Sequence, residues 1–139
     1  MYLVAIIDWY SRFILSWELS DTMEVAFCTE TLQKALRIAT PDIHNSDQGA
    51  QMTAEAYLSI LESNPSIRIS MDHNGRCFDN IFIERFWRSI KYEEVYLKDY
   101  GSPKEARQSI GAYMEFYNYK RFHQSLNYKT PANIYFGKN

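Results

Sequence analysis

The spacing of apolar residues divides the chain into alternating strand-like and helix-like segments. Residues 2–8 are almost entirely apolar, as in a strand buried on both faces, and residues 13–19 alternate after a short turn. These two runs predict an antiparallel hairpin. Segment 23–39 has apolar side chains at helical spacing and ends before Pro41, so it predicts an amphipathic helix.

Shorter segments continue this alternation. We predict a brief strand over residues 42–46, a helix over residues 53–63 and a last strand over residues 67–71. The side chains expected to be buried in that helix are Ala56, Leu58, Ile60 and Leu61. Because strands and helices alternate along the chain, the predicted fold class is α/β.

The most strongly patterned stretch, residues 74–94, begins with turn-forming residues and with Asp79 and Asn80, either of which can cap a helix. From Ile81 onward an apolar stripe is expected at helical spacing: Ile83, Phe86, Trp87 and Ile90. A neighbouring stripe carries one carboxylate and two cations: Glu84, Arg88 and Lys91. By itself, this second stripe is also explained by a solvated face whose ion pair contributes about 0.2–0.5 kcal/mol.

Two further helices are predicted towards the C-terminus. Ser102, Pro103 and Glu105 have the spacing of a capped helix start, and the helix should run to Tyr119. Its inward-facing residues are expected to be Ile110, Tyr113, Met114 and Tyr117. Thr130 precedes a last helical turn over residues 131–135.

Size and composition indicate one globular domain over residues 1–139. The chain is 46% hydrophobic and 23% charged, and it lacks an apolar run of the roughly 18 residues that a membrane span needs. Its apolar start has no basic region or cleavage site of a signal peptide. Cys28 and Cys77 lack metal-ligand spacing, so we expect reduced thiols in the cytoplasm and no membrane partner.

Charge is distributed unevenly along the chain. The net charge is −2, but residues 1–84 carry −7 and residues 85–139 carry +5. This asymmetry suits a protein that holds a metal ion at one place and a polyanion beside it, although it also arises by chance.

Two acids have positions that suit metal binding. Asp47 follows the predicted strand at 42–46, where α/β sheets commonly place ligand sites. Glu84 lies early in the helix predicted to begin at Ile81. Two such carboxylates at one sheet edge can share Mg²⁺, which prefers oxygen ligands. Spacing alone leaves a second interpretation open, in which Asp47 closes a turn and Glu84 is solvated.

Four stretches, in order, carry a family resemblance. They are YLVAIIDWYSRFILSWELS at 2–20, HNSDQGAQMT at 44–53, NGRCFDNIFIERFWRSIKYE at 74–93 and FYNYKRFHQSLNYKTPANIY at 116–135. Together they resemble the integrase-type transposases of bacterial insertion sequences, which have an Asp-Asp-Glu triad and a retroviral-integrase-like catalytic core. The resemblance covers essentially the whole chain and implies a ribonuclease-H-like mixed sheet flanked by helices.

The resemblance implies two catalytic, metal-binding residues in this chain. The family's second Asp corresponds to Asp47, in the S-D-Q-G turn, and its Glu corresponds to Glu84, shortly after Asp79 and Asn80. The implied cofactor is Mg²⁺, with Mn²⁺ as a possible substitute. The separation is one residue longer than is usual in the group, and we assign the extra residue to the turn at 64–66.

The family's first catalytic Asp lies on an earlier strand, in a W-x-x-D-x-T-Y type segment that this sequence lacks. We therefore expect an N-terminally truncated core without its first, central strand and without the upstream DNA-binding region. Asp8 matches a strand-end and turn acid of the family and is not expected to be the missing ligand. The fragment alone is expected to be inactive, and either marginally stable or self-associating through unpaired strand edges.

Basic residues in two places are expected to contact DNA. One group lies on or near the Glu84 face, and the other is interleaved with aromatic residues near the C-terminus. The two groups are Arg85, Arg88 and Lys91, and Lys120, Arg121, His123 and Lys129. The alternatives are surface solubility for the first group and helix packing for the aromatic residues, which we expect for Tyr117 and Phe122.

The resemblance therefore implies metal-dependent DNA strand cleavage and transfer in transposition or integration. The expected partners are the ends of an insertion element, its target DNA and a second copy of the chain. A second interpretation is a non-catalytic DNA-binding or self-associating remnant, because the first Asp is missing. A third is a stand-alone nuclease of ribonuclease-H-like fold, which needs Asp8 or another acid to complete its site.

Overall fold

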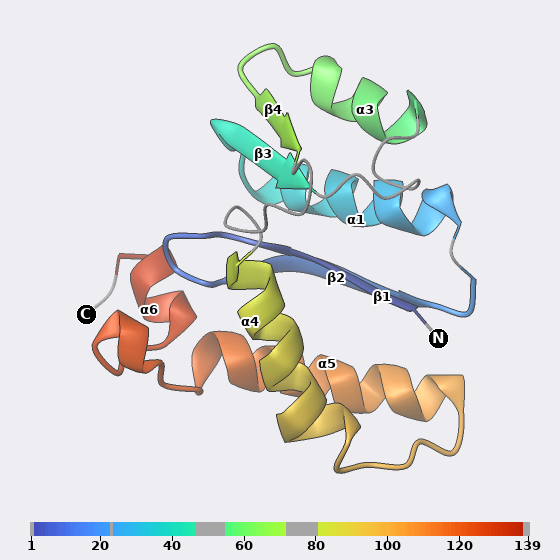
Figure 1. Cartoon of the computed structure of the whole chain (residues 1–139), viewed down its shortest axis with the longest axis vertical. Coiled ribbons are helices and arrows are strands. Elements are labelled where there is room, and N and C mark those ends of the chain that lie inside the picture. Colours follow the sequence, from blue (N-terminus) through green and yellow to red (C-terminus); the bar gives the residue numbers. More distant parts are fainter. Residues whose placement is uncertain (1, 23, 47–54, 72–80, 138–139) are drawn as a thin grey trace. The chain divides into compact units, whose positions relative to one another are not determined.

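The computed structural model describes residues 2–22, 24–46, 55–71 and 81–137 of the chain (Figure 1). The chain divides into two compact units. The first comprises residues 1–6 and 15–81, and the second comprises residues 7–14 and 82–139. None of the helices within the described ranges is long and apolar enough to cross a membrane.

The predicted opening hairpin is present. β1 (Tyr2–Ile7) and β2 (Ile14–Ser20) pair in a two-stranded sheet, and the Asp8 amide donates to the Phe13 carbonyl at 2.9 Å where the chain turns. The prediction that the first strand is buried on both faces is wrong. Val4 is its one fully buried residue and packs with Ile6 on the core of the first unit, while Tyr2 is exposed and the other residues of the strand are half-buried.

The later strands of the first unit form a separate sheet. β3 (Ile43–Ser46) pairs in parallel with β4 (Arg68–Met71), so that Ile43 lies opposite Arg68 and Ser46 opposite Met71. The described strands thus form two pairs, as expected for a mixed sheet that lacks its central strand. That sheet needs an intervening strand to join the pairs, and the described ranges contain no segment that takes this place.

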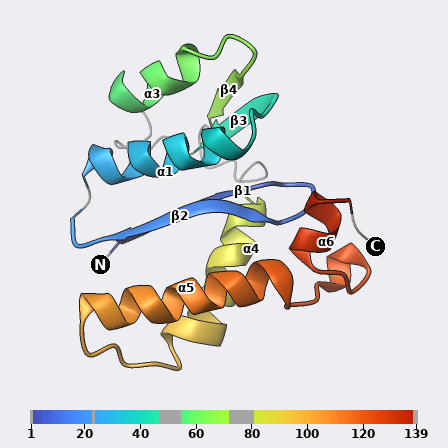
Figure 2. The same cartoon turned by 180° about the vertical axis from the view of Figure 1, so that it is seen from behind.

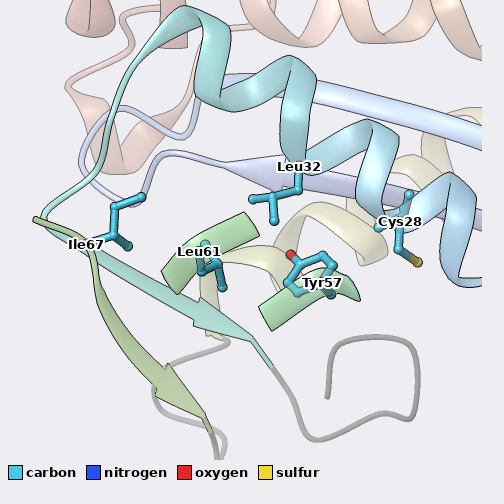
Figure 3. Close-up of a cluster of buried hydrophobic side chains, with 6 residues drawn as sticks. Cys28, Leu32, Tyr57, Leu61 and Ile67 are labelled. Atoms are coloured by element: carbon cyan, nitrogen blue, oxygen red, sulfur yellow. The ribbon is translucent and has the colours of Figure 1, made fainter. Parts of the chain in front are cut away.

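The core of the first unit joins α1 (Val25–Ile38) and α3 (Glu55–Glu62), and Figure 3 shows their side chains converging. Its buried members are Val4, Cys28, Leu32, Tyr57, Leu61 and Ile67. Leu61 is buried as predicted, but Ala56 is exposed. Tyr57 is buried instead, because it lies one helical turn before Leu61 and its hydroxyl group finds a partner in His44 Nε2, at 3.0 Å.

The second unit is mainly helical. α4 (Ile81–Ile90) leads without a break into a π-helical turn, η2 (Lys91–Val95), and crosses the long helix α5 (Pro103–Tyr119) in both views (Figures 1 and 2). A short 3₁₀ turn, η3 (Gln124–Leu126), and α6 (Pro131–Tyr135) complete the chain as described.

Local sequence determines where the last two α-helices begin. Ser102 Oγ accepts a hydrogen bond from the Glu105 amide at 3.1 Å, and Glu105 Oε2 accepts one from the Gly101 amide at 3.0 Å. At α6, Thr130 Oγ1 accepts from the Asn133 amide at 3.1 Å, while Asn133 Oδ1 accepts from the Thr130 amide at 3.3 Å. Both starts were predicted, because each cap needs only residues that are close in sequence.

The core of the second unit is built on α5. Four predicted inward-facing residues of this helix are buried: Ile110, Tyr113, Met114 and Tyr117. The Phe86 ring of α4 meets the Tyr117 ring edge-on at 4.9 Å. The Asn118 amide group exchanges two hydrogen bonds with the backbone of Ile14, of 2.8 and 3.0 Å, and so ties the end of the hairpin turn to α5.

Candidate nucleic-acid interface

The exposed face of α4 carries the predicted polar stripe. Phe86 and Ile90 are buried, as expected for the apolar stripe, while Glu84 and Arg88 are exposed one helical turn apart. Lys91 follows at the start of η2 and is also exposed. The helix therefore presents a carboxylate and two cations on one side, as the sequence predicted.

This face borders a shallow, open groove of about 540 Å³. Its lining residues are Glu84, Trp87, Arg88, Lys91, Tyr92 and Tyr96. The Arg88 guanidinium lies over the Tyr92 ring, 5.7 Å from its centroid, and the Tyr92 and Tyr96 rings meet edge-on at 5.4 Å. Cations and exposed aromatic rings thus occur together beside Glu84, a combination found where proteins bind nucleic-acid strands.

The π-helical turn was not predicted. It is marked by a hydrogen bond from the Tyr96 amide to the Lys91 carbonyl, 2.9 Å long, which spans five residues in place of four. Two consecutive glutamates in this turn, Glu93 and Glu94, both bond to residues of α5 or just after it. Apolar periodicity holds no signal for such contacts, because they join residues far apart in sequence.

Glu94 anchors η2 through a buried network. Its Oε2 atom accepts hydrogen bonds from the hydroxyl groups of Tyr100 and Ser109, each at 2.6 Å, and Lys98 Nζ lies 2.9 Å from Oε1. Burial raises the pKa of the Glu94 carboxyl, but the hydrogen bonds from Ser109, Tyr100 and Lys98 outweigh it, so that the pKa lies below its usual value. The carboxylate is therefore ionised and structurally engaged at neutral pH.

Arg121, which the sequence predicted to contact DNA, forms an ion pair with Glu93. The Glu93 carboxylate pairs with the Arg121 guanidinium through Nε at 2.8 Å and Nη2 at 2.6 Å, and the Tyr113 hydroxyl donates to Oε1 at 3.0 Å. The hydrogen bond from Arg121 lowers the pKa of Glu93, and the same bond raises the pKa of Arg121. The positive charge of Arg121 is thus largely neutralised by Glu93.

The second predicted basic group, near the C-terminus, carries less positive charge than expected. His123 is buried against the edge of Tyr117, and burial together with the charge of Arg121 lowers its pKa to about 4, so it is neutral at pH 7. Lys120 is exposed and Lys129 is half-buried. The expectation that Phe122 packs in the core is wrong: it is 68% exposed and lies just beyond the end of α5.

Asp8 has the turn role that the sequence suggested. Its Oδ2 atom accepts hydrogen bonds from the Ser11 amide at 2.9 Å and the Ser11 hydroxyl at 2.6 Å. In the same turn, Arg12 adopts a left-handed conformation, with φ of 67°, and its guanidinium lies 3.8 Å from the centroid of the Phe82 ring at the start of α4. A hydrogen-bonded turn carboxylate is already committed to local structure.

Asp47, the other residue of the predicted metal site, lies outside the described residues. So do the predicted helix-capping residues Asp79 and Asn80. Within the described ranges no group of three His, Cys, Asp or Glu side chains is placed to hold a metal ion. Glu84 has chemistry that suits a metal ligand, since it offers exposed carboxylate oxygens next to a groove.

Comparison with known protein families finds two matching sequence profiles. A sequence profile described as an integrase core domain matches residues 1–77, and a second profile with the same description matches residues 65–131. The chain belongs to the integrase core domain family. The resemblance inferred from the motifs is therefore confirmed, and the second matched range of this integrase core family includes all of α4, η2 and α5.

Relatives in this family include transposases of bacterial insertion sequences. The chain is 33% identical over 138 residues to the transposase for insertion sequence element IS904 of Lactococcus lactis, covering 96% of the chain and 54% of the relative. It is 32% identical over 138 residues to transposase InsF for insertion sequence IS3A of Escherichia coli, covering 96% and 48%. The chain thus spans about half the length of the curated relatives it matches.

A solved structure supports the same fold. A chain in the cryoEM structure of the simian T-cell lymphotropic virus intasome, in complex with PP2A regulatory subunit B56 gamma, matches with a TM-score of 0.78. The match covers 94% of the present chain and 46% of the other, at 15% sequence identity. The integrase-like architecture, with mixed strands and helices, is therefore retained despite low sequence identity.

Proposed function

We propose that this chain is the catalytic core of a transposase that cleaves DNA strands and joins them to a target during transposition. The observation that carries this proposal is the similarity to an insertion-sequence transposase over 96% of the chain. We infer a ribonuclease-H-like organisation, in which an intervening strand completes one mixed sheet. The proposed activity is that of the whole-length relatives, of which the chain spans about half.

We propose Asp47 and Glu84 as catalytic residues that hold a divalent ion, Mg²⁺ or Mn²⁺. Glu84 fits this role because its carboxylate is exposed beside a groove and is flanked by cations that can receive a phosphate. When bound, the metal polarises a phosphodiester and activates the attacking oxygen. The family's third carboxylate is not assigned to Asp8, since Asp8 is bonded to Ser11.

The basic residues are proposed to position the DNA backbone. Arg88 and Lys91 lie on the Glu84 side of α4 and can each neutralise a phosphate, while Arg85 is exposed next to Glu84. Lys120 and Lys129 are retained as phosphate contacts. Arg121 and His123 are assigned a supporting role within this cluster, since Glu93 pairs with Arg121 and His123 is neutral.

Binding of Mn²⁺ to the 139-residue chain tests the metal site without requiring activity. Electron paramagnetic resonance should detect weak binding of one ion to the unaltered chain, and Asp47→Asn or Glu84→Gln should each abolish it. Glu115→Gln is the matched control, because Glu115 is an exposed glutamate on α5. If both site variants bind Mn²⁺ as well as the control does, Asp47 and Glu84 do not form the site.

The partners proposed are the ends of an insertion element, target DNA and a second copy of the chain, in the cytoplasm. A competing function is a DNA-binding remnant without catalysis. DNA binding that persists in an upstream-extended chain, with no metal-dependent cleavage of a labelled DNA end, would favour the remnant.

A further inference from the structure

The groove on α4 extends past the charged residues onto two exposed tyrosines. Tyr92 is 62% exposed and Tyr96 is 64% exposed, and both line the groove with Arg88. Their rings contact each other edge-on at 5.4 Å, so they form a continuous aromatic surface. The proposed metal and phosphate contacts do not involve this surface.

The π-helical turn brings Tyr96 to the groove. In a regular α-helix each four-residue step advances about 40° beyond a full turn, so Tyr96 would lie roughly 120° around the helix from Glu84. The five-residue hydrogen bond between the Tyr96 amide and the Lys91 carbonyl widens the turn and takes up part of this drift. Tyr96 and Glu84 consequently line the same groove.

The opposite side of η2 is bonded to α5 and to residues just before and after that helix. Glu93 is held by Arg121 and Tyr113, and Glu94 by Tyr100 and Ser109. Because consecutive residues of the turn are anchored, the tyrosines on the groove side are presented on a rigid backbone. A rigid aromatic surface loses little conformational entropy when a planar group binds to it.

Charge next to the rings specifies the kind of planar group. The Arg88 guanidinium lies over Tyr92, and Lys91 lines the same groove, so an anion attached to the planar group is also accommodated. A nucleotide has this combination of a flat base and a phosphate. A base inside a duplex is already stacked on both sides, whereas an unpaired base can place its faces on protein rings.

We propose that Tyr92 and Tyr96 form a stacking platform for unpaired bases at the end of a DNA strand, with Arg88 and Lys91 holding the adjoining phosphates. The proposal rests on the proposed function, because it assumes that the α4 face binds DNA. It assigns to the tyrosines a preference for DNA ends that carry unpaired nucleotides over blunt ends. This preference is independent of base identity, since every base has a π face.

Fluorescence anisotropy on the 139-residue chain tests the platform with two probes, a blunt duplex and the same duplex with a short unpaired overhang. Tyr92→Ala and Tyr96→Ala should each weaken binding of the overhang duplex roughly tenfold and leave the blunt duplex unchanged. Tyr92→Phe and Tyr96→Phe should bind like the unaltered chain. Tyr10→Ala is the matched control, since Tyr10 is an 80% exposed tyrosine outside the groove.

A 2-aminopurine base in the overhang gives a second, direct signal. Its fluorescence should be quenched on binding to the unaltered chain and to both Phe variants, and should recover in the Ala variants. Equal losses on blunt and overhang duplexes, or an equal loss in Tyr10→Ala, would overturn the platform. So would sedimentation data in which the Ala variants change self-association and leave overhang binding intact, because the rings would then contact a second copy.

The failure of the platform is distinguishable from failure of the proposed function. If Arg88→Ala weakens binding of both duplexes while the tyrosine variants bind the overhang normally, the α4 face binds DNA and only the platform is wrong. If neither duplex binds the unaltered chain, or if Arg88→Ala changes neither affinity, the DNA-binding role of this face fails and the platform fails with it.

Discussion

Arg121 and Glu93 form a two-point ion pair across 28 residues of sequence, with Nε 2.8 Å from Oε1 and Nη2 2.6 Å from Oε2. The pair ties the segment after α5 to η2, and both side chains are only partly exposed. A guanidinium held in this way stabilises the protein more than it serves as a mobile phosphate contact.

Glu93→Gln should lower the free energy of unfolding at pH 7 by about 1 kcal/mol, because it removes the charge of the pair but keeps the side-chain shape. The pKa of Glu93 is lower in the folded chain than in the unfolded one, so its contribution is present above the unfolded pKa and is lost as pH falls through the folded pKa. Urea unfolding at pH 7 and pH 3 measures this. A difference between variant and parent that is as large at pH 3 as at pH 7 would contradict the assignment.

Glu94→Ala should be more damaging, with a loss of roughly 3 kcal/mol, since Glu94 is 3% exposed and its removal leaves the hydroxyl groups of Tyr100 and Ser109 without their acceptor. Thermal or urea unfolding monitored by circular dichroism measures the loss. Glu115→Ala, on an exposed position of α5, serves as the control and should change stability by less than about 0.5 kcal/mol. Comparable losses in the two variants would show that the buried network is not the cause.

His123 should titrate well below an ordinary histidine. Burial and the neighbouring Arg121 lower its pKa to about 4, so folded protein binds fewer protons than unfolded protein between about pH 6.5 and pH 4. Stability is therefore expected to fall as pH is lowered through this window. Proton NMR of the imidazole C2–H measures the pKa directly, and an apparent pKa near 6.5 would contradict the buried, neutral histidine.

Arg88→Ala and Lys91→Ala should weaken DNA binding at all sequences alike. Each lost phosphate contact should reduce the slope of log K against log salt by about 0.9. Binding isotherms at several salt concentrations measure the slope. Lys104→Ala, an exposed lysine in the first turn of α5, is the control and should leave the slope unchanged. A slope that is identical in all four proteins would show that this face does not touch the DNA backbone.

Features that depend on neighbouring residues were predictable from the sequence. The helix starts at Ser102 and Thr130 follow from side chains three residues away, and the α4 stripe follows from its period. Contacts between distant segments were not predictable. The π-helical turn is held by hydrogen bonds that Glu94 accepts from Ser109 and Glu93 accepts from Arg121, and these donors lie 15 and 28 residues away.

Burial was less predictable than secondary structure for the same reason. Tyr57 is buried where Ala56 was expected, because the position of a short helix against α1 and the partner offered by His44 decide which face turns inward. Phe122 was expected in the core and is exposed just beyond α5. In the candidate site, the sequence identified Glu84, Arg88 and Lys91 but not the two tyrosines beside them, since exposed rings have no periodic signal.

We propose above that Glu84 is the catalytic glutamate of a DNA-joining enzyme that needs a third carboxylate besides Asp47 and Glu84. A strand-joining assay on a pre-cut DNA end with Mg²⁺ or Mn²⁺ tests it most directly. We expect no joining by residues 1–139, robust joining by a chain extended through a W-x-x-D-x-T-Y type segment, and loss of that joining in the extended Glu84→Gln variant. Joining by residues 1–139 that disappears in Asp8→Asn, or joining by the extended chain that survives Glu84→Gln, would contradict it.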